Sequence, residues 1–423
     1  MKNKIFTLLL ITFFLGVLIT SCEKEKVYRS DQTTTEEFYT IMNQWYYWKD
    51  SIGDVDPDLY SSPVDLLETM RYQPRDKWSY ITTQEEHSQY YEEGAYVGYG
   101  FSYAPDETGN VRIAFLYDDS DFKAAGVDRG WIIKKINDVT VDQNADINSL
   151  LGANSVGVAN KIEFQSPTGE IISDIFAKKV ISMNTVGYEN TFDVGTKKVG
   201  YFVFESFIGP SLNELTDVFN YFKTEGVNEL VVDLRYNGGG RMDVVIKLAG
   251  LIIPDHVNGE VFIKYEHNED RTRFNESVPF EQEAGSLKLN KIYFLTSKGS
   301  ASASEVIINS LDPYLDVYTI GDDTYGKPVG MYSFVSNVSN LVYAPVAFKM
   351  VNADEYGGYY GGLKADSYAE DELSAPFGLG EAMFDEALYH IENGSFNSLK
   401  SAGEIYRAPV KEIRTIKEQR GTI

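Results

Sequence analysis

Residues 291–311 read KIYFLTSKGSASASEVIINSL and predict a buried strand, a sharp turn and a helix in succession. The apolar run Lys291–Thr296 is typical of a short buried strand. From Glu305 to Leu311 the apolar residues recur at helical spacing. Ser302 is therefore expected at the strand-to-helix turn, facing the first free N–H groups of the helix and the positive end of its dipole. Because a developing oxyanion requires such donors, Ser302 is a candidate nucleophile.

A candidate base follows in the segment Thr324-Tyr325-Gly326-Lys327. The intervening residues have room for a helix, a turn and one more strand, Val317–Ile320, returning beside the first, so Lys327 could reach Ser302. A lysine acts as a general base only if burial brings its pKa far below the free value of about 10.4. On these residues alone, an ordinary exposed lysine in a glycine-containing turn is an equal alternative.

A second apolar strand, Leu230–Leu234, runs into the triple glycine Gly238–Gly240. Glycines adopt positive φ and let the backbone approach a ligand closely, so their N–H groups can face a developing negative charge. The alternative is a flexible turn that joins this strand to a helix over Met242–Ile252. Asp233 and Arg235 are most simply a buried ion pair that holds the loop in shape.

Together these segments resemble the carboxyl-terminal processing, or tail-specific, serine proteases, whose fold is related to the ClpP/crotonase superfamily. The family's patterns D-L-R-x-N-x-G-G, S-A-S-A-S-E and T-F-G-K-G are matched by Asp233–Gly240, Ser300–Glu305 and Thr324–Pro328. The resemblance implies an α/β peptidase core in which Ser302 is the nucleophile and Lys327 the base. It implies an oxyanion hole made by the N–H groups of Gly239 and Ala303, and it requires no metal or organic cofactor.

Two residues depart from the family pattern. Many members carry a glutamine four residues after the lysine, where this chain has Met331. Pro328 replaces the usual glycine after the lysine, which stiffens the turn and removes a backbone donor. Either another group or apolar packing holds Lys327, or catalysis is weak.

The region between about Tyr96 and Ala177 resembles a PDZ domain. Gly98-Tyr99-Gly100-Phe101 is similar to a carboxylate-binding loop, and Ala124–Asn137 is similar to a stretch that these proteases share, with Trp131 where an aspartate is usual. Such a domain binds an extended C-terminal peptide as an added strand. The resemblance therefore implies that Gly98, Tyr99, Gly100 and Phe101 bind peptide. The alternative is a small β-rich adaptor that only packs against the core.

The first residues predict an exported, lipid-anchored protein. Lys2 and Lys4 precede an apolar run, and Thr20-Ser21-Cys22 follows it, which is typical of a secretory signal with a lipoprotein cleavage site. Cys22, the only cysteine, is the expected lipidation site, so the membrane would be reached only through the lipid. The alternative is an incidental thiol after a plain signal peptide. The resemblance to bacterial lipoproteins implies the outer membrane of a Gram-negative cell, on its periplasmic face or at the cell surface.

The chain of 423 residues is long enough for several domains. Apolar spacing at Phe38, Ile41 and Trp45 predicts a helical cap before the β-rich region, and strands alternating with helices predict an α/β core after it. The expected division is a signal peptide at 1–21, a lipidated tether at 22–35, an N-terminal helical cap at 36–90, a PDZ-like domain at 91–182, a serine peptidase core at 183–398 and a C-terminal tail at 399–423.

The predicted function is that of an exported serine endopeptidase that cleaves polypeptides near their C-termini. The competing hypothesis is a catalytically weak or inactive peptide-binding lipoprotein on the same fold, and a third is binding of a small apolar ligand in the core groove. A net charge of −25 disfavours nucleic acid as a partner. Four scattered histidines and one cysteine make a zinc site improbable.

Overall fold

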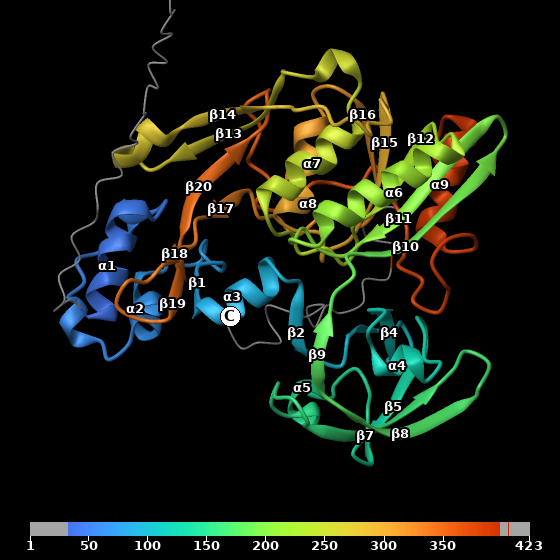
Figure 1. The fold of residues 1–423 in the computed structure, drawn as a ribbon, viewed down its shortest axis with the longest axis horizontal. Coiled ribbons are helices and arrows are strands. Elements are labelled where there is room, and N and C mark those ends of the chain that lie inside the picture. The colour runs from blue at the N-terminus through green and yellow to red at the C-terminus, as the bar shows by residue number, and fades with distance from the viewer. Residues whose placement is uncertain (1–32, 398–404, 406–423) are drawn as a thin grey trace, which may run out of the picture.

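A six-stranded sheet forms the centre of the computed structural model, which describes residues 33–397 and residue 405 (Figure 1). Its strand order is β10-β11-β12-β15-β16-β21. All neighbours from β11 to β21 are parallel, and β10 is antiparallel to β11. The strands are β10 (Val186–Val194), β11 (Lys197–Phe204), β12 (Glu229–Asp233), β15 (Lys291–Thr296), β16 (Asp316–Gly321) and β21 (Ser367–Tyr368).

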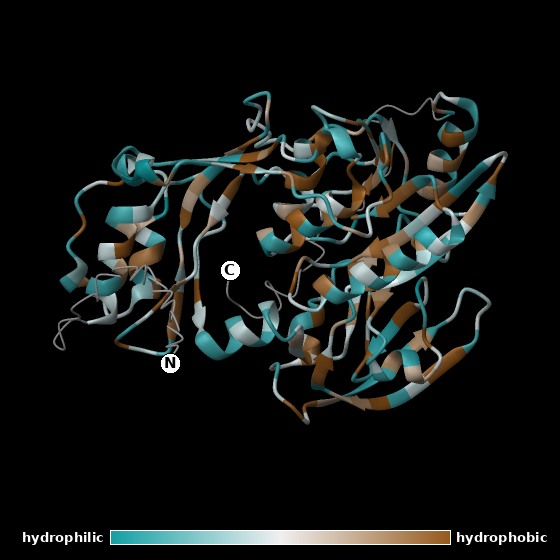
Figure 2. Cartoon of the chain, turned by 45° about the horizontal axis from the view of Figure 1, so that its top comes forward, coloured by the Kyte–Doolittle hydropathy of each residue, from teal (hydrophilic) through white to brown (hydrophobic). Residues whose placement is uncertain are grey.

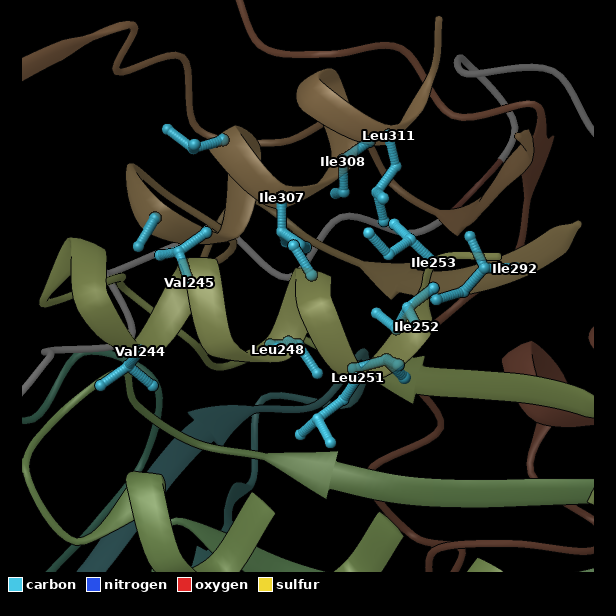
Figure 3. Packing of buried hydrophobic residues seen from close by; sticks show 14 of the residues in the cluster. Val244, Val245, Leu248, Leu251, Ile252, Ile253, Ile292, Ile307, Ile308 and Leu311 are labelled. Atoms are coloured by element: carbon cyan, nitrogen blue, oxygen red, sulfur yellow. The ribbon is translucent and has the colours of Figure 1, made fainter. Parts of the chain in front are cut away.

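Helices cover both faces of this sheet, as the alternation of its apolar residues requires. In β12, Leu230 and Val232 pack in one cluster with α6 (Ser211–Glu225), α7 (Met242–Ile252) and α8 (Ala303–Leu311). Val231, between them, packs on the opposite face against α9 (Ala382–Asn393). Figure 3 shows the contact of α7 with α8 and Ile292 of β15. The predicted strands at 230–234, 291–296 and 317–320 and the predicted helices at 242–252 and 305–311 are confirmed.

The parallel strands bring three loops to one edge of the sheet, because the carboxyl ends of parallel strands lie side by side. β12 leads into the glycine loop, β15 leads to Ser302, and β16 leads to Lys327. The predicted candidates therefore meet at the carboxyl edge of the sheet.

A second sheet, in the order β14-β13-β20-β17, links the core to the N-terminal part (Figure 1). It consists of β13 (Val261–His267), β14 (Glu276–Pro279), β17 (Val329–Met331) and β20 (Val346–Val351). The predicted cap contains α1 (Thr34–Trp45), α2 (Pro63–Met70) and α3 (Gln84–Tyr91). It is not wholly helical, because β1 (Tyr80–Thr83) joins β18 (Phe334–Val335) and β19 (Leu341–Ala344) in a small sheet.

The cap is held to the second sheet by Asp76. Its carboxylate accepts bonds from the Tyr46 and Ser79 hydroxyls at 2.8 and 2.6 Å. The Ser79 hydroxyl in turn accepts the N–H of Val346 in β20 at 2.9 Å. This buried chain of hydrogen bonds fixes the cap against the second sheet.

Residues between the cap and the core form a separate β-rich unit with its own apolar core around Phe122 and Phe164. β2 (Ala95–Gly98) pairs with β9 (Lys179–Ser182) at the entry and exit of the unit. Its sheet runs β3-β4-β5-β7-β8, with β6 beside β5. The elements are β3 (Phe101–Pro105), β4 (Val111–Leu116), β5 (Ile132–Ile136), β6 (Val139–Thr140), β7 (Ala159–Gln165), β8 (Ile171–Ala177), α4 (Asp121–Ala124) and α5 (Ile147–Leu151). Figure 2 shows apolar segments on its strands and polar residues on its loops.

The predicted signal peptide, Cys22 and most of the tether and tail lie outside the described residues. Among the helices that the structure describes, none has the length and apolar character needed to span a bilayer. The described residues also contain no group of three or more His, Cys, Asp or Glu side chains arranged to hold a metal ion.

Candidate active site

Ser302 lies at the N-cap of α8 with φ +56° and ψ −113°. A positive φ is uncommon outside glycine and marks a strained position that the surrounding structure must hold. A serine on a sharp turn between a strand and a helix presents its side chain at the edge of the sheet, as nucleophiles of hydrolases do. Ala303, the first residue of α8, has an N–H that no carbonyl within the helix can accept.

The carboxylate of Glu305 joins the serine segment to the lysine segment. Its Oε2 accepts the N–H groups of Ser302 and Lys327 at 2.9 and 2.8 Å. Its Oε1 accepts the Thr324 hydroxyl and the Gly326 N–H, both at 2.6 Å. Since one oxygen atom binds both backbone nitrogens, the main chains of Ser302 and Lys327 are close neighbours. Burial raises the pKa of Glu305, and the four donated bonds oppose this rise.

Asn237 joins the glycine loop to the serine segment. Its carbonyl accepts the Ala301 N–H at 3.1 Å and the Ser304 hydroxyl at 2.8 Å. Its side-chain oxygen accepts the Gly239 N–H at 2.9 Å, and its side-chain NH₂ donates to the carbonyl of Phe204 at 2.9 Å. The loop is thus an ordered element, in contrast to the flexible turn considered as an alternative.

Gly239 faces the Ser302 turn directly. Its φ is +98°, and a Cβ atom at this position would lie 2.8 Å from the Ala301 carbonyl oxygen and 2.9 Å from the Ala303 nitrogen. Both predicted oxyanion donors are therefore adjacent to Ser302. The Gly239 N–H already has an acceptor in Asn237, so it would have to share this bond with an oxyanion or release it.

Lys327 is buried, with 8% of its surface exposed, so the exposed-lysine alternative is wrong. Met331 ends β17 and packs among the apolar residues between the cap and β17. Its thioether cannot orient an ammonium group as a glutamine side chain would. The position of the Lys327 main chain is set instead by Glu305.

The predicted ion pair of Asp233 with Arg235 is confirmed at 2.9 Å, and both side chains are fully buried. Arg235 also donates to both oxygens of Glu381 at 2.8 and 2.9 Å, and to Asp371 at 2.9 Å. Asp371 is further bound by Arg129 of the β-rich unit at 2.8 Å. Burial alone would raise the pKa of Asp371, but the guanidinium groups of Arg129 and Arg235 lower it to about 2.

A cavity of about 700 Å³ lies beside the predicted peptide-binding loop, between β3, α5 and the start of α3. Gly98, Tyr99 and Phe101 line it, whereas Gly100 is not among its lining residues and packs against Ser120. Lys178 also lines the cavity and donates to the carbonyls of Gly152 and Ala153 and to Asn154, at 2.7, 3.0 and 2.8 Å.

Sequence reasoning assigned no role to Glu305 or to Asn237. The spacing of Ser302 and Glu305 matches the capping-box pattern S-x-x-E, so a first role for Glu305 could have been found. Glu381 and Asp371 had no such signal, because they lie far along the chain from Arg235.

The site combines a serine at a helix N-terminus, a glycine loop and a buried lysine at one edge of a parallel sheet. Residues 198–355 match the model of peptidase family S41, and residues 35–80 match that of the peptidase S41 N-terminal domain. Over these two segments the chain is similar to peptidase family S41.

Curated relatives include the probable CtpA-like serine protease of Staphylococcus aureus strain COL, 25% identical over 309 residues, which are 72% of this chain and 58% of that protein. The protein of the same description from Staphylococcus epidermidis is 25% identical over 310 residues, again 72% of this chain and 58% of that one. This chain thus spans a little over half the length of these relatives.

Two solved structures share the fold. A Bacteroides fragilis protein described as an S41 protease is 23% identical, with a TM-score of 0.69, over 85% of this chain and 97% of that one. The photosystem II D1 C-terminal processing protease is 17% identical, with a TM-score of 0.52, over 82% of this chain and 94% of that one.

Proposed function

We propose that this chain is an exported serine endopeptidase that cleaves polypeptides near their C-termini, with Ser302 as nucleophile and Lys327 as base. The observation that carries the proposal is the single Glu305 oxygen that accepts the N–H groups of both residues. The match of residues 198–355 to peptidase family S41 and the strained backbone of Ser302 support it further.

In the proposed reaction, neutral Lys327 takes the proton of the Ser302 hydroxyl as the serine oxygen attacks the scissile carbonyl. The N–H groups of Ala303 and Gly239 stabilise the tetrahedral oxyanion. Lysine then donates the proton to the leaving amine, and water cleaves the acyl-enzyme. Lys327 has 8% of its surface exposed, and the proposed reaction requires its neutral form.

Substrate tails would be captured by the β-rich unit, which we interpret as a PDZ-like domain. A peptide could add as a strand beside β3, with its end near Gly98, Tyr99 and Phe101 in the 700 Å³ cavity. Gly100 would shape the loop through its positive φ of 77°.

We further propose export and anchoring through a lipid on Cys22, on the strength of the N-terminal sequence alone. The Gram-negative outer membrane stays a prediction, and the curated relatives named above come from Staphylococcus.

A catalytically weak or inactive peptide-binding protein is the competing function. Met331 in place of the expected glutamine favours it, as does the Gly239 N–H that Asn237 already accepts.

The test is cleavage of unfolded polypeptides, with free or amidated C-termini, by the chain beginning after Cys22. Wild type should cleave, with weaker activity on amidated tails, whereas Ser302→Ala and Lys327→Ala should not, and all three should keep the same circular dichroism spectrum. Retained activity in Ser302→Ala would refute the assignment. Tight peptide binding without cleavage by any variant would establish the binding protein instead.

A further inference from the structure

Glu205 is a buried acid that the proposed peptidase mechanism does not use. It follows β11 directly and has only 6% of its surface exposed. Within the described part of the chain, neither of its carboxylate oxygens has a hydrogen-bond partner. An ionised carboxylate costs several kcal/mol or more when it is buried without a partner. Such a side chain therefore calls for a ligand or a bound proton.

Glu205 lines a cavity of about 150 Å³ where the β-rich unit meets the core. Four aromatic residues line it as well: Phe115 and Tyr117 from the β-rich unit, Tyr188 from β10, and Phe377, whose ring centre lies 4.4 Å from the Arg129 guanidinium. Cavities of about this size can hold a molecule as large as benzene. The electron-rich faces of aromatic rings attract ammonium groups, and rings gathered around a cation are a known means of recognising them.

The cations already at this cavity have other partners. Arg129 lines it but donates to Asp371, to the Tyr236 hydroxyl at 2.6 Å and to the Ala114 carbonyl at 2.8 Å. Lys123, also in the wall, forms an ion pair with Asp118. Neither cation donates a hydrogen bond to Glu205.

The charges around the cavity leave an excess of negative charge. The adjacent network holds three carboxylates, from Asp233, Asp371 and Glu381, against the two guanidinium groups of Arg129 and Arg235. Asp128 adds a further carboxylate to the cavity wall, and its Oδ1 accepts the Arg129 N–H at 2.7 Å. Burial raises the pKa of Glu205 well above its ordinary value, the charge of Asp233 adds to the rise, and Arg129 and Arg235 only partly oppose it.

We propose that this cavity is a binding site for a small organic cation with an ammonium head group, which pairs with the Glu205 carboxylate between the aromatic rings. The ligand is a free amine or the amino group of a polypeptide side chain. The bound ligand would contact both the β-rich unit and the core. Glu205 lies two residues before Phe207, whose N–H donates to the Gly239 carbonyl at 3.2 Å. The proposal is independent of peptidase activity.

The test is calorimetric titration of the chain beginning after Cys22 with n-butylammonium chloride, with n-butanol and potassium chloride as the neutral and inorganic probes. Butylammonium should bind at least about tenfold more tightly than butanol or potassium. Binding near neutral pH should also release close to one proton, because Glu205 becomes ionised. The number of protons released is obtained by repeating the titration in buffers of different ionisation enthalpy.

Glu205→Gln should weaken butylammonium binding by about tenfold or more and abolish the proton release. Phe115→Leu should weaken binding about fivefold through loss of a ring. Glu189→Gln, which changes an exposed acid on β10 outside the cavity, is the matched control and should bind like wild type. Equal binding by wild type and Glu205→Gln, or butanol binding as well as butylammonium, would show that the cavity holds only water or neutral molecules and would overturn the proposal.

Two peptides separate the sources of the amine. An N-acetylated, amidated alanine hexapeptide with one lysine should displace butylammonium if polypeptides supply the ligand, and its norleucine counterpart should not. If neither peptide competes while butylammonium still binds through Glu205, the ligand is a free amine. Competition by the lysine peptide and absence of competition by either peptide both support a cation site. The proposal is refuted if no ammonium compound binds in a way that depends on Glu205.

Discussion

Replacing Glu305 by glutamine tests whether one carboxylate holds the nucleophile and base segments together. The four donors around it are the Ser302, Gly326 and Lys327 N–H groups and the Thr324 hydroxyl. Glutamine offers one acceptor oxygen in place of two. Its NH₂ group should turn toward the Oε1 position, because the Thr324 hydroxyl there can rotate and accept a bond, whereas the backbone donors cannot.

The cost follows from these contacts. The Gly326 N–H is left without an acceptor, at about 1–3 kcal/mol, and two remaining bonds change from a charged to a neutral acceptor, at about 1 kcal/mol each. Glu305→Gln should therefore destabilise this region by about 3–5 kcal/mol, a large part of the 5–15 kcal/mol that stabilises a typical protein. If Ser302 and Lys327 are the catalytic pair, kcat should fall by at least about a hundredfold, with little change in KM.

The assay is hydrogen–deuterium exchange of peptides covering 296–311 and 320–331, together with peptide cleavage. Protection should fall by at least about a hundredfold in both segments, since each 1.4 kcal/mol is a factor of ten. Glu392→Gln, at the exposed end of α9, is the matched control. Unchanged exchange in both segments would refute the reasoning, whatever the activity.

Three further predictions concern single positions. Gly239→Ala should lower kcat by at least about a hundredfold, because residue 239 has a positive φ and its new Cβ would collide with the Ser302 turn. Labelling of Ser302 by a fluorophosphonate should slow in parallel. Labelling at the wild-type rate would contradict this prediction. Wild type should lose stability as pH rises from about 4.3 through the raised pKa of Glu205, by at most about 1.4 kcal/mol per pH unit, and Glu205→Gln should not show this loss. Urea unfolding at pH 5 and pH 8 measures the free energy of unfolding of both proteins. An equal change in this free energy between the two pH values in both proteins would count against the prediction. Met331→Gln should change kcat/KM by less than about threefold if Glu305 sets the position of Lys327, and a tenfold gain in the cleavage assay would show that the missing glutamine limits catalysis.

The sequence predicted the central elements well because their signals are local. Lys291–Thr296 and Met242–Ile252 form a strand and a helix with the predicted bounds, since each is a continuous apolar or periodic segment between turn residues. The cap was only partly predicted. β1 becomes a strand because β19 pairs with it, and this partner lies more than 250 residues away.

The candidate site was predicted as a set of residues, but the means of holding them together was not. The motifs named Ser302, Lys327 and the glycines, whereas the interactions that join them arise only when three loops meet at one edge of the sheet. Arg235 shows the same limit. Its pair with Asp233 spans two residues and could be predicted, but its bidentate contact with Glu381 joins positions that no local pattern relates.

The structure shows how the main chain of Lys327 is held in place. A lysine that acts as a base must keep its nitrogen in place, and the family pattern that the sequence resembles has a glutamine where this chain has Met331. In this chain the constraint falls on the main chain: Glu305 accepts the Lys327 N–H, and Pro328 fixes the φ angle that follows. The same carboxylate accepts the Ser302 N–H, so one side chain restrains the main chains of the proposed nucleophile and the proposed base. If Lys327 is the base, as we propose, this restraint on its main chain makes Met331 compatible with catalysis.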